Sequence, residues 1–88
     1  MTMYSFEIKE ELEKTLQKLA RKDKKNYEAI TKKMLQIAGN PEIGKPLRNI
    51  LKGKKRVHIG HFVLIYEVDD KAKKVSFLEF EHHDKAYR

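Results

Sequence analysis

Apolar and polar residues along the chain repeat with periods that distinguish strands from helices. Tyr4 to Ile8 alternates apolar and polar residues, which is the period of a strand with one buried face. From about Lys9 to Lys22, Leu12, Leu16 and Leu19 are spaced by four and three residues and form one stripe. The pattern therefore predicts a short strand followed directly by an amphipathic helix.

A second helix is predicted immediately after the first one. Asp23 is a residue type that caps helix starts, and Gly39, Asn40 and Pro41 provide a stop. Between these signals, apolar residues continue at spacings of three and four: Tyr27, Ile30, Met34 and Ile37. Because the joint between the helices is short, we expect them to form an antiparallel hairpin.

The second half of the chain changes to strand patterns. Glu42 to Gly53 contains a proline and two glycines and is predicted to be a connector. Strands are predicted at Lys54–Ile59, His61–Val68 and Lys73–Glu81, with a turn at Asp69–Ala72. The element order indicates a single α+β domain: an N-terminal strand, an antiparallel helix hairpin, and a three-stranded antiparallel meander. The helices should cover one face of a curved sheet and leave the other open.

Strand alternation assigns side chains to the two faces of this sheet. The helix-facing side is predicted to contain Phe62, Leu64, Tyr66, Val68, Leu78 and Phe80. The open side is predicted to contain His61, Val63, Ile65, Glu67, Phe77, Glu79, Glu81 and His83. Lys54, Arg56 and His58 share one parity, and a turn or bulge at Gly60 could bring them to the open side.

The composition narrows the range of partners. Twenty Lys and Arg against thirteen Asp and Glu leave a formal charge of +7 on 88 residues. Such an excess attracts polyanions, of which nucleic acid is the commonest, although it also serves solubility alone. The absence of cysteine excludes disulfides and thiol catalysis. The longest apolar run, Phe62–Tyr66, is too short for a membrane span, and Met1–Ser5 does not resemble a signal peptide, so a cytoplasmic location is expected.

All four histidines lie in the last third of the chain, in two groups. Arg56–His61 contains two of them, and Glu81–Tyr87 contains the other two. Histidines exchange protons near neutral pH, and beside Lys and Arg they could do so next to a bound phosphate. That combination suits phosphate-ester cleavage. The pair His58 and His61 could also bind zinc, but further ligands are not evident, so no metal or other cofactor is predicted.

The segments Lys45–Gly53, Phe62–Val68 and Glu81–Tyr87, together with the element order, resemble the RelE/ParE toxin superfamily. The resemblance covers nearly the whole chain. It implies the toxin of a type II toxin–antitoxin system that cuts messenger RNA in the ribosome and is neutralised by an acidic, RelB-like antitoxin. It implies no membrane partner and no small-molecule cofactor.

The resemblance extends to individual positions. His83 stands four residues before Tyr87, a spacing similar to the catalytic His of the YafQ-type subgroup. His58 and His61 fall near that subgroup's His and Asp. The chain departs from the pattern at Val63, where RelE-type toxins usually have a catalytic Arg, and at His61, where the subgroup has Asp.

Cleavage of RNA by its own 2′-hydroxyl needs a base, an acid and positive charge near the phosphate. His83 is the first choice for proton transfer as the acid, with His58 or His61 in the complementary role. Arg56 would clamp the phosphate, and Tyr87 would stack on a base or orient the phosphate. Glu79 and Glu81 could orient His83. The RNA backbone would be held by Lys52, Lys54, Lys55 and Arg48.

Two other functions remain open from the sequence. The ParE branch shares the fold but acts on DNA gyrase and is not a nuclease. A degenerate homologue could instead retain only antitoxin binding and RNA affinity, because Val63 replaces the usual Arg.

Overall fold

The computed structural model describes residues 3–46 and 54–82. Its elements follow the chain as β1 (Ser5–Ile8), α1 (Glu10–Lys22), α2 (Lys24–Gly39), the 3₁₀ helix η1 (Pro41–Ile43), β2 (Lys45–Pro46), β3 (Lys54–Ile59), β4 (Phe62–Asp69) and β5 (Lys74–His82). None of the helices in these ranges has the length and hydrophobicity needed to cross a bilayer.

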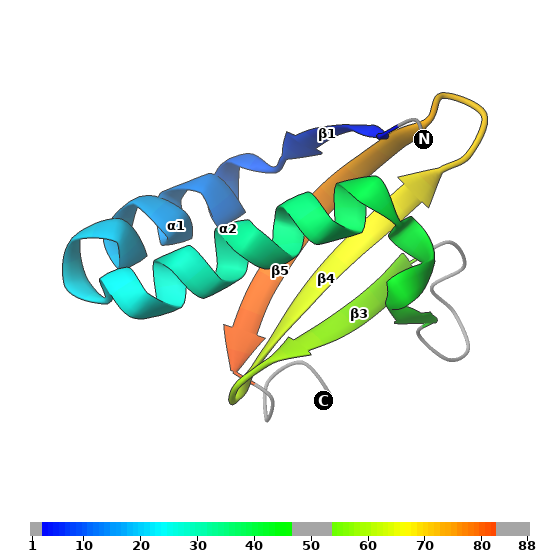
Figure 1. The fold of residues 1–88 in the computed structure, drawn as a ribbon. Helices are drawn as coiled ribbons and strands as arrows, with labels where there is room; N and C mark the ends of the chain where they lie inside the picture. The colour runs from blue at the N-terminus through cyan, green and yellow to red at the C-terminus, as the bar shows by residue number, and fades with distance from the viewer. Residues whose placement is uncertain (1–2, 47–53, 83–88) are drawn as a thin grey trace.

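The strands form one mixed sheet in the order β1-β5-β4-β3-β2. β3, β4 and β5 pair antiparallel as the predicted meander, and β1 is parallel to β5. The helices α1 and α2 lie side by side over one face of this sheet (Figure 1). The predicted α+β fold class is therefore confirmed, including the antiparallel helix hairpin.

The predicted signals also place the helix ends. α1 buries Leu12 and Leu16 and carries acidic residues in its first turn and basic residues in its last turn. This arrangement complements the helix dipole. The carboxylate of Asp23 accepts a hydrogen bond from the backbone N–H of Asn26 at 3.2 Å and so caps α2. α2 then ends at Gly39, directly before Asn40 and Pro41.

The core lies between the two helices and the sheet. Its buried cluster contains Leu12, Leu16, Ile30, Met34, Ile37, Leu64, Tyr66, Val75, Phe77 and Phe80. Tyr66 also makes two hydrogen bonds from this core to the backbone of the segment after α2. Its hydroxyl donates to the C=O of Pro41 at 2.8 Å and accepts from the N–H of Gly44 at 2.9 Å. Burial raises the pKa of Tyr66, so the hydroxyl stays protonated and able to donate.

The connector prediction was wrong at one point. Lys45 and Pro46 form β2, which pairs antiparallel with Arg56 and Lys55 of β3. Two residues are too few for periodicity to reveal a strand. The pairing depends instead on the tertiary link of Tyr66 to Pro41 and Gly44, which holds the chain beside β3.

The face prediction was wrong for Phe77 and Leu78. Ile65 pairs with Glu79, but Tyr66 pairs with Phe77, so Leu78 is an extra residue in β5. Such a bulge shifts the alternation of side chains by one residue. Phe77 therefore enters the helix-facing core and is fully buried, whereas Leu78 is not part of the core cluster.

The start of the central strand also differs from prediction. β4 begins at Phe62, and His61 lies with Gly60 in the turn that joins β3 to β4. Gly60 has a φ of 62°, a conformation that favours glycine. His61 is therefore exposed at the tip of a hairpin and does not lie within a strand.

Candidate functional site

The candidate site is the sheet face that points away from the helices. Along one row Arg56 is opposite Ile65, which is opposite Glu79. Along the next row His58 is opposite Val63, which is opposite Glu81. Directly opposite residues in an antiparallel pair project to the same side. The prediction that Arg56 and His58 share a face with Glu79 and Glu81 is therefore confirmed.

Charge on this outer face changes sign from one side of the sheet to the other. The basic side lies on β2 and β3 and comprises Lys45, Lys54, Arg56 and His58. The acidic side lies on β4 and β5 and comprises Glu67, Glu79 and Glu81. Lys45 is opposite Arg56, and the Nε atom of Arg56 is buried. A guanidinium can bind two oxygens of one phosphate, while neighbouring lysines add point charges.

Val63 and Ile65 separate the two charged sides. They lie on the face away from the helices and are nevertheless only 0% and 8% exposed. Val63 has no ionisable group, so this position supplies neither charge nor a proton. The titratable side chains of Arg56, His58, Glu79 and Glu81 flank this buried pair on β3 and β5.

The acidic side continues onto the edge strand β1. Glu67 of β4 is opposite Ser76 of β5, and Ser76 is opposite Glu7. The Ser76 hydroxyl donates to Glu7 Oε1 at 3.0 Å, and Lys74 Nζ lies 3.1 Å from Glu7 Oε2. The hydrogen bonds from Lys74 and Ser76 lower the pKa of the Glu7 carboxyl.

Lys55 does not join the other predicted phosphate ligands. It is opposite Tyr66, so it points to the helix side of the sheet. Its Nζ lies 3.3 Å from Glu42 Oε2, and its side chain is only 19% exposed. Lys54, one residue earlier, lies on the outer face, so the basic run Lys54–Arg56 divides between the two faces.

The histidine pair that the structure brings together is His61 and His82. Their rings are parallel, with 6.4 Å between centroids and an interplanar angle of 14°. His82 also meets Phe62 edge-on at 5.7 Å. The sequence analysis gave His82 no role in the candidate site. The signal that could have found it was the register, since His82 pairs with Phe62, the residue after His61.

Four predicted site residues lie outside the described residues: Arg48, Lys52, His83 and Tyr87. Their roles remain predictions, as do those of His58, His61, Arg56, Glu79 and Glu81. Within residues 3–46 and 54–82, no group of three or more His, Asp or Glu residues is arranged to hold a metal ion.

Comparison with solved structures shows which class of protein has this fold. The fold matches the crystal structure of the toxin–antitoxin complex RelBE2 from Mycobacterium tuberculosis, with a TM-score of 0.79, 26% identity and 93% of each chain covered. It also matches the archaeal RelE–RelB complex from Pyrococcus horikoshii, with a TM-score of 0.76, 20% identity and 93% and 97% coverage. The chain thus has the RelE-type toxin fold.

Sequence comparison then identifies the family. The profile of the ParE toxin of type II toxin–antitoxin systems matches residues 6–87. A Methanocaldococcus jannaschii protein named RelE4, described as a candidate toxin, is 49% identical over 87 residues, which are 98% of this chain and 93% of that protein. The chain belongs to the ParE toxin family of the RelE/ParE superfamily. The predicted resemblance is confirmed.

Proposed function

We propose that this toxin is a messenger-RNA endoribonuclease that acts in the ribosome and blocks translation. The observation that carries the proposal is the outer face, where the register places Arg56 and His58 together with Lys45 and Lys54. This arrangement combines a bidentate phosphate ligand, a group that titrates near neutral pH, and supporting positive charge.

The proposed reaction is an attack of the ribose 2′-hydroxyl on the adjacent phosphorus. A bond forms between O2′ and phosphorus, and the bond from phosphorus to O5′ breaks, leaving a 2′,3′-cyclic phosphate and a 5′-hydroxyl. His58 accepts the 2′-hydroxyl proton, and His83 donates a proton to O5′. Arg56 stabilises the charge on the phosphate oxygens. His61 is the alternative base, and no step draws on a metal or an organic cofactor.

The remaining predicted residues assist in this proposal. Tyr87 stacks on a base or orients the phosphate. Lys54 holds the RNA backbone together with Lys52 and Arg48. Glu79 and Glu81 lie on the same face and orient the proton-transferring histidine. Lys55 has no role in this proposal, because its ion pair with Glu42 lies on the other face.

The proposed partners are messenger RNA, the ribosome and a cognate RelB-like antitoxin. The structural neighbours from M. tuberculosis and P. horikoshii are toxin–antitoxin and RelE–RelB complexes, which supports an antitoxin for this chain. A toxin that acts on translating ribosomes would work in the cytoplasm.

Cleavage of a translated messenger RNA by the purified toxin tests the proposal. We expect cut products that end in a 2′,3′-cyclic phosphate. His58→Ala and His83→Ala should each lower the cleavage rate by about 10²–10⁴-fold, the usual contribution of one general acid or base. Lys55→Ala is the matched control and should cleave at the wild-type rate. Wild-type activity in both histidine variants would contradict the assigned roles.

Because the matching family profile is that of a ParE toxin, a toxin that acts on DNA gyrase is the alternative function. A gyrase-acting toxin would leave messenger RNA intact and inhibit DNA supercoiling in the parallel assay. Antitoxin binding without effect in either assay would identify a degenerate homologue, in keeping with Val63.

A further inference from the structure

The tip of the helix hairpin gathers five cations within eight residues of the chain. They lie at the end of α1 and the start of α2, on either side of Asp23, and all are exposed: Lys18, Arg21, Lys22, Lys24 and Lys25. Figure 1 shows this turn at one end of the molecule. We call the five residues the hairpin-tip cluster. The five cations and the one carboxylate of Asp23 leave a charge of +4, which is more than half of the +7 of the whole chain.

The hairpin-tip cluster is not neutralised by nearby carboxylates. In the part of the chain that the structure describes, the lysines that form ion pairs all lie elsewhere: Lys9, Lys14, Lys55 and Lys74. The carboxylate of Asp23 accepts hydrogen bonds from Asn26 instead, at 3.2 Å from the backbone N–H and 2.6 Å from Nδ2. Since this carboxylate caps α2, the cations around it keep their full charge for an external partner.

The position of these cations opposes the local stability of both helices. Lys18 and Lys22 stand four residues apart on α1, where like charges repel each other. Lys24 and Lys25 lie in the first turn of α2, which has no acidic residue, and the helix dipole disfavours cations at that end. Folded proteins break such local rules mainly at functional sites. The cluster is therefore better explained by binding than by stability.

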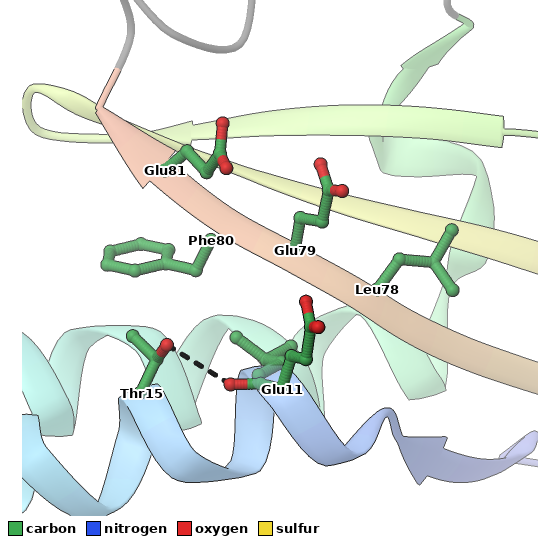
Figure 2. Close-up of a pocket in the computed structure, with 7 residues that line it drawn as sticks. Glu11, Thr15, Leu78, Glu79, Phe80 and Glu81 are labelled. Carbon is green, nitrogen blue, oxygen red and sulfur yellow. Dashed lines mark hydrogen bonds between the residues drawn. The ribbon is translucent and has the colours of Figure 1, made fainter.

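The opposite end of the hairpin has the opposite charge. The first turn of α1 carries acidic residues, one of which is Glu11. Figure 2 shows Glu11 pointing toward β5, where Glu79 and Glu81 lie. Charge along the hairpin thus changes from acidic beside β5 to basic at the tip. A polyanion would be attracted to the tip and repelled from the start of α1.

The side chains of the tip fit phosphate groups better than a protein surface. Stable protein interfaces need a centre of buried apolar or aromatic side chains. Among the described residues, the large apolar side chains that are exposed all lie outside the tip: Met3, Phe6 and Leu35. Contacts to nucleic-acid phosphates need only cations, and the tip supplies five of them.

The same side chains favour a double helix over a single strand. Proteins that bind single-stranded RNA stack its bases on aromatic rings. Tyr27 is the aromatic residue closest to the cluster in sequence, and it packs against the hydrophobic core. Double-helical RNA keeps its bases stacked inside and presents its phosphates outside, so a surface of flexible cations without a ring is sufficient to bind it.

We propose that the hairpin-tip cluster binds the phosphate backbone of double-helical ribosomal RNA. The outer face with Arg56 and His58 points away from the helices, so messenger RNA and the ribosomal duplex contact separate surfaces of the toxin (Figure 1). The inference rests on the proposed function. It adds the surface through which the toxin binds the ribosome while the outer face acts on messenger RNA.

Binding to a short RNA duplex at several salt concentrations tests the surface. Lys24→Gln combined with Lys25→Gln removes two charges from the cluster. Lys32→Gln combined with Lys71→Gln removes two exposed charges elsewhere and is the matched control. In the cluster variant, the slope of log affinity against log salt concentration should decrease by about 1.8, at about 0.9 per duplex phosphate contact. An unchanged slope, or an equal decrease in the control, would overturn the inference.

Urea unfolding separates lost binding from a damaged fold. Removing cations from the first turn of α2 relieves their unfavourable interaction with the helix dipole. The cluster variant should therefore unfold at a higher urea concentration than the unsubstituted protein, although it binds the duplex more weakly. A lower midpoint would show that Lys24 and Lys25 serve the fold, and would contradict their assignment to binding.

Cleavage on purified ribosomes tests whether the duplex is ribosomal. The cluster variant should need a severalfold higher ribosome concentration for half-maximal cleavage of translated messenger RNA and should reach the same maximal rate. The control variant should match the unsubstituted toxin in both quantities. Weaker duplex binding without any change in the ribosome requirement would overturn the ribosomal assignment.

Affinity for the antitoxin encoded beside the toxin gene tests the other acidic partner. The cluster variant and the control variant should bind this antitoxin equally well. A loss of antitoxin affinity confined to the cluster variant, with an unchanged duplex slope, would assign the tip to the antitoxin and refute the RNA surface.

Failure of this inference is distinguishable from failure of the proposed function, because duplex binding is measured without catalysis. A toxin that cleaves messenger RNA but shows no effect of the cluster variant would retain the proposed reaction and lose this surface. A toxin that does not cleave but shows the change in slope would lose the reaction and retain the RNA surface.

Discussion

At the scale of single residues, Tyr66 connects the core to the candidate site. Its hydroxyl joins Pro41 C=O and Gly44 N–H, which are the start of η1 and the residue before β2. A Cβ on Gly44 would collide with this hydroxyl, so glycine is required for the close approach. The link places Lys45 beside Arg56 and thereby completes the basic side of the outer face.

Tyr66→Phe is expected to lower the free energy of unfolding by about 1–3 kcal/mol. The substitution leaves a buried N–H and a buried C=O without their shared partner. Urea unfolding monitored by circular dichroism measures the change, and Tyr27→Phe, at the margin of the core, is the control. Equal midpoints for Tyr66→Phe and the unsubstituted protein would show that the hydroxyl contributes nothing.

At the scale of elements, the β1–β5 pairing joins the two ends of the described chain. Ser5 N–H donates to Lys73 C=O at 3.0 Å, and Glu7 binds Ser76 and Lys74 through its side chain. These contacts close a sheet whose other strands are neighbours in sequence. The bulge at Leu78 then lets Phe77 and Phe80 both face the helices while Glu79 and Glu81 face outward.

The pairing of β1 with β5 should weaken in acid. Because the folded pKa of Glu7 is lowered from its ordinary value of 4.5, the stability that its carboxylate contributes is present above that pH. It is lost as the pH falls through the lowered pKa. Glu7→Gln should therefore be less stable than the unsubstituted protein at pH 7, and the difference should shrink toward pH 3.

Urea midpoints at several pH values measure this effect. Glu28→Gln, an exposed position on α2, serves as the control and should differ little from the unsubstituted protein at any pH. A pH-independent gap between Glu7→Gln and the unsubstituted protein would exclude a linked titration at Glu7.

At the scale of the whole molecule, the formal charge of +7 conceals an uneven distribution. The outer face is basic on β2 and β3 and acidic on β4 and β5. The net charge would attract a polyanion, and the basic side of the outer face would bind it. The acidic side would repel phosphate, so binding of RNA to this face would be directional.

Lys54→Ala should reduce the salt dependence of binding to single-stranded RNA. One lost phosphate contact removes about 0.7 from the slope of log affinity against log salt concentration. Lys55→Ala removes the same charge from the opposite face and should leave the slope unchanged. Binding isotherms at three or more salt concentrations give both slopes. An equal decrease for the two variants would mean that net charge, and not the face, determines binding.

Both helices and their ends could be predicted because each depends on residues that are close together in the sequence. The leucine stripe of α1, the Asp23 cap and the stop at Asn40–Pro41 each depend on neighbours within one or two helical turns. The shared face of Arg56 and His58 followed from strand alternation alone, and the antiparallel register confirmed it.

The features that were not predicted depend on contacts between residues that are far apart in the sequence. No local pattern of residues encodes such contacts. A single extra residue at Leu78 reverses the faces of β5, and only the pairing of β4 with β5 shows it. β2 depends on a distant contact as well, because Tyr66, 22 residues after Gly44, binds the backbone directly before this strand. The pairing of His61 with His82 likewise needed the register of two strands.

The sequence by itself thus determined the two α-helices, the four longer strands, the charge and the family, because each depends on residue types and short spacings. Tertiary structure alone decided that Lys55 pairs with Glu42, 13 residues earlier in the chain. It also decided that β1 pairs with β5 only as far as Phe77. Both outcomes depend on contacts between segments that are distant in the sequence, and these are settled by packing across the whole sheet.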